Sequence, residues 1–306
     1  MSALLSTLLT PYAPLHGAFL SYLIYHPPRR RDRRAPAEVG LTPEDLVVPL
    51  PGGGRLAAWL FRNDPERVVV VGHGIGLSRS ASLRHAKFLH EAGYTVVLFD
   101  HRNHGRSSQD RAFWKLGHRF TTDVVTVVEH VRALPGHADA RFAVYGFSFS
   151  TFPVSYVPTR PEARVSAIVC DSGPVVDIPS LFRGFLDTDG IPVPAALRRG
   201  PARRVLEGTF AALGTGMLQA QWPPPVEPYA DTPVLFLAGE DDVVVPTAGV
   251  RELARRFPLG QFRSLPGTGH LAGLKTLGDT YSSAVLDFLA AAFERPVRNV
   301  PATREP

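Results

Sequence analysis

The stretch RFAVYGFSFS, residues 141–150, decides the fold class of this chain. Its first half is a short apolar run typical of a buried strand, and GFSFS is the sharp turn that leads from such a strand into a helix. In that turn Ser148 is expected to take a strained backbone conformation with positive φ, at a cost of about 1–3 kcal/mol. Gly146 and Ser150 are small, as the close crossing of strand and helix requires, although Gly is more usual where Ser150 stands. The pattern predicts an exposed, nucleophilic Ser148.

Strand-like and helix-like segments alternate on both sides of this turn, which predicts a mostly parallel sheet with helices on both faces. Continuous β-branched and apolar runs typical of strands buried on both faces occupy residues 67–72, 94–100, 164–171 and 233–239. An opening hairpin is expected at 46–50 and 55–62, and a short late strand at 261–265. Helices are expected at 80–92, 119–134, 247–257 and 279–293.

The alternation breaks between residues 172 and 231, which are rich in Pro, Gly and Arg and contain only short helical patterns. We interpret this segment as a helical cap inserted over the carboxyl ends of the strands, where α/β proteins bind ligands. The predicted organisation is a leader at 1–40, an α/β domain at 41–294 with the cap at about 172–231, and a loose tail at 295–306.

A serine hydroxyl is a poor nucleophile until a base takes its proton, and an acid must hold that base in the correct tautomer. The sequence PGTGH places His270 in the loop between the last strand and the last helix. The segment LAGEDDVVVP follows the preceding strand, and its spacing selects Asp242 as the acid. Asp241 is assigned to solvation or helix capping, and Asp171, also at a strand end, is the alternative acid.

Acyl transfer also requires backbone N–H groups that stabilise an oxyanion. The residue after the nucleophile, Phe149, is expected to supply one such group. The second is assigned to Ile75 in the loop GHGIG, residues 72–76, which follows the first central strand. His73 and Gly74 support that loop, and Gly74 allows its backbone to turn.

With the order Ser, Asp, His, each at the end of a different strand, the chain resembles the α/β-hydrolase superfamily. The resemblance is to its bacterial serine-hydrolase branch, near the esterases and serine-aminopeptidase-like proteins, and covers about residues 40–294. The segment FDHRNHGRSS, residues 99–108, is similar to a family segment in which Gly stands where this chain has Asn103. The leader sequences YHPPRR and LTPEDL also resemble leaders of this branch. The resemblance implies two-step acyl transfer through an acyl-enzyme.

We therefore expect hydrolysis of small-molecule carboxylic esters with apolar acyl groups, without metal or cofactor. A thioesterase, amidase or peptidase with the same triad remains open, as do a non-catalytic α/β-hydrolase-like binding protein and a membrane-tethered adaptor. An Asp or a Cys in place of Ser148 would have indicated a dehalogenase, an epoxide hydrolase or a dienelactone-type enzyme. The single cysteine, Cys170, excludes an internal disulfide framework and a Cys-rich zinc site.

Most of the excess of basic over acidic residues comes from one short segment. The chain has 33 Lys and Arg against 28 Asp and Glu, for a net charge of +5, and RRRDRR at residues 29–34 holds most of the excess. Nucleic-acid binding would need basic residues spread along a face, so it is not expected.

An apolar stretch, residues 3–25, precedes the arginines. A secretory signal would place its charge before the apolar run, and Pro11 and Pro14 disfavour a full membrane span. The interpretations are a helix docked on the domain followed by a solvated linker, contact with a membrane through residues 3–34, or a cleaved signal. A cytoplasmic location is expected, because arginines that flank an inserted segment stay inside.

Overall fold

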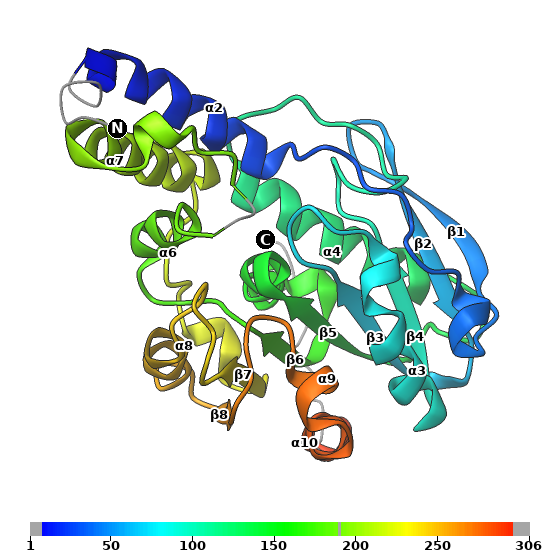
Figure 1. The fold of residues 1–306 in the computed structure, drawn as a ribbon. Helices are drawn as coiled ribbons and strands as arrows, with labels where there is room; N and C mark the ends of the chain where they lie inside the picture. Colours follow the sequence, from blue (N-terminus) through cyan, green and yellow to red (C-terminus); the bar gives the residue numbers. More distant parts are fainter. Residues whose placement is uncertain (1–7, 189–190, 296–306) are drawn as a thin grey trace, which may run out of the picture.

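The computed structural model describes residues 8–188 and 191–295 of the 306-residue chain (Figure 1). Its centre is an eight-stranded sheet in the order β1-β2-β4-β3-β5-β6-β7-β8. The first two strands form an antiparallel hairpin, β2 pairs antiparallel with β4, and all later neighbours are parallel. This confirms the predicted α/β-hydrolase type of sheet. The predicted tail from residue 296 onward and residues 3–7 of the leader lie outside the described residues.

The strands follow the sequence pattern closely. They are β1 (Glu44–Pro49), β2 (Arg55–Phe61), β3 (Asp64–Gly72), β4 (Tyr94–Phe99), β5 (Arg141–Phe147), β6 (Val165–Asp171), β7 (Val234–Gly239) and β8 (Gly260–Leu265). The α-helices are α2 (Ala13–Tyr25), α3 (Leu83–Glu91), α4 (Leu116–Arg132), α5 (Thr151–Val154), α6 (Ile178–Phe185), α7 (Gly200–Leu218), α8 (Thr247–Ala254), α9 (Gly273–Leu277) and α10 (Asp279–Glu294).

Two hydrophobic layers hold the sheet. Helices α4 and α8 bury valines and leucines against one face, whereas α3 and α10 cover the other. Strands β4 and β7 are buried along their whole length, which explains why their sequences are continuous apolar runs rather than alternating ones. The parallel strands all end at the same edge of the sheet, which is held between the two layers of helices. The loops that follow the strands at this edge carry the candidate site.

The differences from the predicted elements concern their ends. Strand β3 begins at Asp64, three residues before the predicted start. Helix α4 begins at Leu116, three residues before its predicted start. Helix α8 ends at Ala254, three residues before its predicted end at Phe257. The helix after the turn at Ser148 is very short, and Pro153 lies within it at a position that needs no internal N–H bond. A short additional helix, α9, follows His270.

Helices α6 and α7 occupy the interruption between β6 and β7, and the leader helix α2 packs along α7 (Figure 1). The packing is close, because a Cβ on Gly17 would lie 2.9 Å from the Thr209 Cβ. The Tyr25 hydroxyl donates to the Gly214 carbonyl of α7 at 2.8 Å. The leader helix therefore belongs to the same hydrophobic cluster as helices α6 and α7.

A membrane-crossing helix is absent from residues 8–188 and 191–295, since none of their helices has both the required length and the required apolar character.

Candidate active site

Ser148 lies at the sharp turn after β5 with a φ of 48°. This is the strained conformation expected from the sequence, and it turns the side chain out of the sheet at the end of the strand. The turn leaves no room at Gly146, where a Cβ would lie 2.5 Å from the Ser150 carbonyl oxygen. The small residues on either side of Ser148 are thus a packing requirement of the turn.

The structure brings the three predicted polar residues together. The His270 Nε2 lies 2.9 Å from the Ser148 Oγ, and its Nδ1 lies 2.8 Å from the Asp242 Oδ2. The Asp242 carboxylate is fully buried, while the His270 side chain is 21% exposed. The other carboxylate oxygen of Asp242 accepts the N–H groups of Val244 and Val245 at 2.9 and 2.8 Å. These bonds hold the carboxylate in one orientation, directed at the imidazole.

The neighbouring carboxylates are placed differently. Asp241 is exposed and does not cap α8, so the predicted capping role is wrong, while the predicted solvation holds. Asp171 is buried and accepts the hydroxyl hydrogens of Ser172 and Tyr281. Burial raises the pKa of Asp171 to about 6, although these two hydrogen bonds act in the opposite direction. Asp171 makes no hydrogen bond with His270 among the described residues.

The loop after β3 approaches Ser148 from the other side. A Cβ on Gly74 would be 3.6 Å from the Ser148 Cβ, so the two backbones run close together. Ile75 and Phe149, the two predicted oxyanion donors, both line the pocket at Ser148. The Ile75 N–H donates no hydrogen bond within the part of the chain that the structure describes.

Three buried histidines support this loop. The His73 Nδ1 donates to the Gly74 carbonyl at 2.8 Å, and the His104 Nε2 accepts the Gly76 N–H at 3.1 Å. His101 contacts the Ser150 hydroxyl, with 2.9 Å between its Nε2 and the Oγ. Burial lowers the pKa of His73 to about 4 and that of His104 to about 3, and it holds the pKa of His101 well below the usual value. The histidines are neutral at pH 7 and act as hydrogen-bond links between the loop and the turn.

His73 was predicted as loop support, whereas no role was predicted for His101 and His104. The signal was present, because both lie in the segment FDHRNHGRSS directly after a buried strand that neighbours β3. In the same segment Asn103 takes the left-handed conformation with a φ of 66°. Asn tolerates this conformation, so the turn is kept although Gly is replaced.

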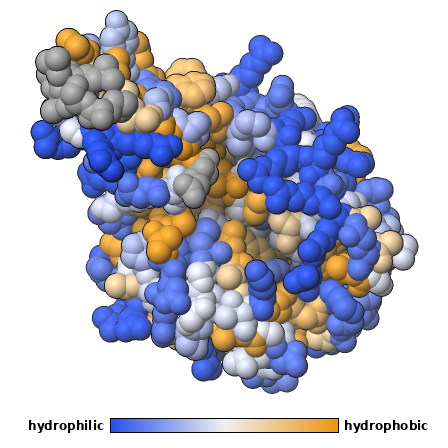
Figure 2. Space-filling model, in the orientation of Figure 1, coloured by the Kyte–Doolittle hydropathy of each residue, from blue (hydrophilic) through white to orange (hydrophobic). Residues whose placement is uncertain are grey.

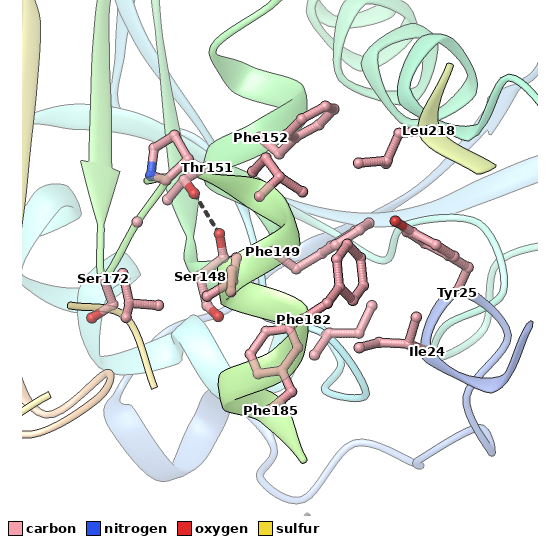
Figure 3. Close-up of a pocket in the computed structure, with 16 residues that line it drawn as sticks. Ile24, Tyr25, Ser148, Phe149, Thr151, Phe152, Ser172, Phe182, Phe185 and Leu218 are labelled. Carbon is pink, nitrogen blue, oxygen red and sulfur yellow. Dashed lines mark hydrogen bonds between the residues drawn. The ribbon is translucent and has the colours of Figure 1, made fainter. Parts of the chain in front are cut away.

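A narrow apolar pocket, here called the inner pocket, extends from Ser148 toward helices α2, α6 and α7 (Figure 3). In Figure 3 aromatic and aliphatic side chains lie on one side of Ser148, and they come from α2, from α6 and α7, and from the turn and α5 that follow β5. Its apolar side chains are those of Ile24, Tyr25, Ile75, Phe149, Phe152, Ile178, Leu181, Phe182, Phe185, Leu218 and Val245. The contribution of Ile24 and Tyr25 was not predicted, because the leader was treated as separate from the cap.

A second depression, here called the outer cleft, also reaches Ser148 and includes His270. Its walls come from the last turns of α2, the segment from Pro27 to Arg30, and the loops around Ile75 and Leu271. Figure 2 shows apolar surface in the central part of this face of the molecule. The two depressions meet at Ser148, so a bound molecule can extend to both sides of that hydroxyl.

Other reactive groups are remote from this chemistry. Cys170 is buried in β6, and burial raises the pKa of its thiol to about 12, so it stays protonated and unreactive. No group of three or more His, Cys, Asp or Glu suited to a metal ion occurs within the residues that the structure describes.

Two family models match the chain. The model of serine aminopeptidase S33 matches residues 63–199, and that of TAP-like protein matches residues 217–299. Together with the fold, these matches confirm the predicted resemblance to the α/β-hydrolase superfamily. The predicted bacterial serine-hydrolase resemblance, to the esterase and serine-aminopeptidase-like proteins, is confirmed.

Solved structures of similar fold include esterases. The esterase Pf2001 of Pyrococcus furiosus is 21% identical with a TM-score of 0.70, over 87% of this chain and 96% of that one. The α/β hydrolase GrgF of Penicillium sp. sh18 is 18% identical with a TM-score of 0.65, over 83% and 99%. A thermophilic esterase of Thermogutta terrifontis is 18% identical with a TM-score of 0.59, over 82% and 99%. At these identities the similarity establishes the fold of the chain.

Proposed function

We propose that the protein is a serine hydrolase that cleaves carboxylic esters of apolar acyl groups. The observation that carries the proposal is the continuous relay from Ser148 through His270 to Asp242, with 2.9 and 2.8 Å between the bonded atoms. A nucleophile, a base and an orienting acid in this arrangement make up the machinery of acyl transfer.

In the first step the His270 Nε2 takes the proton of Ser148 as its Oγ attacks the ester carbonyl carbon. The tetrahedral intermediate collapses when the imidazolium gives that proton to the departing alkoxide, which leaves an acyl-enzyme and a free alcohol. Water then repeats the sequence with His270 as base and releases the acid. Asp242 keeps the Nδ1 protonated and stabilises the imidazolium in both steps.

The oxyanion is stabilised by the N–H groups of Ile75 and Phe149 in this proposal. Each such donor typically contributes about 100- to 1,000-fold to the rate. The support is the position of both residues at Ser148 and the unpaired Ile75 N–H. The bonds of His73 and His104 to the flanking Gly74 and Gly76 hold this loop in one conformation.

The inner pocket is assigned to the acyl group and the outer cleft to the alcohol. The inner pocket is lined by aromatic and aliphatic side chains, and the polar side-chain groups near Ser148 are all hydroxyls. The pocket therefore suits a hydrocarbon chain. No acidic side chain lines either depression within the described residues.

The test is a nitrophenyl ester series of increasing acyl length, with a thioester, an aryl amide and an aminoacyl anilide as competing substrates. We expect turnover of short-to-medium acyl esters and little of the anilide. Ser148→Ala should lose roughly 10⁴-fold or more in kcat, whereas Ser282→Ala on α10 should match the unmodified protein. Preferred turnover of the thioester, amide or anilide would reassign the substrate, and equal rates for Ser148→Ala would overturn the mechanism.

A further inference from the structure

The leader carries a stripe of large apolar side chains that face away from the protein. The stripe consists of Leu8, Tyr12, Leu15, Phe19 and Tyr22, with exposed fractions of 64, 62, 71, 52 and 42%. Successive members are four or three residues apart, a spacing that places them on one face of a helix. In Figure 2 apolar surface gathers at the end of the molecule where α2 lies.

These exposed side chains are not on the face of α2 that packs against the protein. The opposite face of α2 packs on α7 through Gly17 and Ser21, so the helix already has its internal partner. Half of the ten large apolar side chains that are exposed in the described part of the chain lie on this single segment. Such a concentration indicates a contact surface rather than scattered exposure.

The arginines that follow the helix have no acidic partners among the residues that the structure describes. Arg30, Arg31, Arg33 and Arg34 are exposed and line one depression together with Arg84. Within the described residues no carboxylate lies within ion-pair distance of any of these five guanidinium groups.

Asp32, the acid inside this basic run, turns toward the protein. It lies 3.8 Å from the Arg79 guanidinium and 3.6 Å from that of Arg106. The segment therefore presents positive charge outward without internal compensation.

We propose that residues 8–34 dock the protein onto an anionic lipid surface. The apolar stripe would enter the boundary between headgroups and acyl chains, and the arginines would contact lipid phosphates. Charge complementarity favours this occupant over a second copy of the chain, since a symmetric partner would bring the same uncompensated arginines to the interface.

The outer cleft adjoins this surface. Leu20, Leu23 and Ile24 of α2 form one of its walls, and Pro27, Pro28 and Arg29 continue that wall. Docking through α2 and the arginine segment therefore brings the opening that leads to Ser148 next to the lipid. The docking itself does not depend on the proposed hydrolase activity, and it is tested by binding alone.

The experiment is co-sedimentation of the full-length protein with vesicles of phosphatidylcholine, and with vesicles that also contain phosphatidylglycerol. We expect binding to the anionic vesicles that weakens with salt. The double variant Leu15→Ser/Phe19→Ser should bind at least about tenfold more weakly. Arg31→Gln/Arg34→Gln should bind about 30-fold more weakly, at roughly fivefold per arginine.

Two control variants change equivalent residues elsewhere. Val47→Ser alters a side chain that is 61% exposed on β1, and Arg255→Gln/Arg256→Gln removes two exposed arginines beside α8. Both should bind like the unmodified protein. All altered side chains are exposed, and circular dichroism checks that each variant is folded.

Three outcomes would overturn the proposal: no vesicle binding, equal binding to neutral and anionic vesicles, or equal loss in the control variants. Light scattering after size-exclusion chromatography tests the competing occupant, which is a second copy of the chain. A dimer that Leu15→Ser/Phe19→Ser dissociates, without vesicle binding, would assign the stripe to a second copy of the chain.

Discussion

Asp242 differs from the nearby carboxylates in what its two oxygens contact. One oxygen accepts two backbone N–H groups and the other faces His270, whereas Asp171 is occupied by Ser172 and Tyr281. The spacing of the segment LAGEDDVVVP was enough to select Asp242 from the sequence. One of the two hydroxyl partners of Asp171, Tyr281, comes from a distant part of the chain, so the separate role of Asp171 could not be read from the sequence.

Asp242→Asn should lose about 10⁴-fold in kcat, because an amide no longer selects the required imidazole tautomer. Asp241→Asn, which changes an exposed neighbour, should stay within about twofold of the unmodified protein by the usual size of surface effects. Ester kinetics on the three purified proteins provide the measurement. A large loss in Asp241→Asn alone would move the acid to that position.

Ser150 stands where a smaller residue is usual, and its side chain fills the space beside Gly72 and His101. A Cβ on Gly72 would overlap the Ser150 hydroxyl. Gly72→Ala is therefore expected to destabilise the protein by about 1–3 kcal/mol. Ser150→Gly in the same chain should recover part of that loss, with a coupling of about 0.5 kcal/mol or more. Urea unfolding of the two single variants and the double variant measures the coupling, and additive effects would contradict this packing.

At the scale of elements, the parallel strands were the most predictable part. Runs such as VVVV in β3 and VVLF in β4 place apolar side chains on both faces of the sheet. These side chains can be buried only where a layer of helices covers each face. Helix ends were less predictable, since α8 stops at Ala254 and the chain continues in turns. The partner of α2 could not be deduced, because an apolar helix fits a membrane, a cap or another protein equally well. Gly17 and Ser21, four residues apart, were the available sign of a close helix contact.

Gly17→Leu should separate α2 from α7, because a side chain there meets Thr209 and the Leu206 carbonyl. Ile24 and Tyr25 would then leave the wall of the inner pocket. The KM for a hexanoyl ester is expected to rise roughly tenfold through lost apolar contact, with a much smaller change for an acetyl ester. Leu15→Phe, at a position 71% exposed on the same helix, is the matched control. Equal changes for both esters would show that α2 does not shape the acyl site.

At the scale of the whole molecule, the buried histidines make stability depend on pH. His73, His85, His101 and His104 have pKa values lowered by burial, while the unfolded chain takes up protons near pH 6.5. Stability is therefore fully present above about pH 6.5 and falls as the pH drops, by up to about 1.4 kcal/mol per pH unit for each group. Asp171, with its raised pKa, acts in the opposite sense between about pH 4 and 6.

Four histidines outweigh one aspartate, so the urea midpoint of unfolding should fall between pH 7 and pH 5. His104→Gln should reduce the pH slope by about one proton, whereas His118→Gln, which changes an exposed histidine, should leave the slope unchanged. A midpoint that is constant or rises on acidification would show that these histidines are not held neutral in the folded protein.

The central claim is that Ser148 is the nucleophile of the molecule, and covalent trapping tests it most directly. The protein is treated with a fluorophosphonate, and the adduct is located by peptide mass spectrometry. We predict one adduct on Ser148, with labelling slowed strongly in His270→Ala and absent in Ser148→Ala. An adduct on Ser150, or undiminished labelling of the Ser148→Ala protein, would contradict the account.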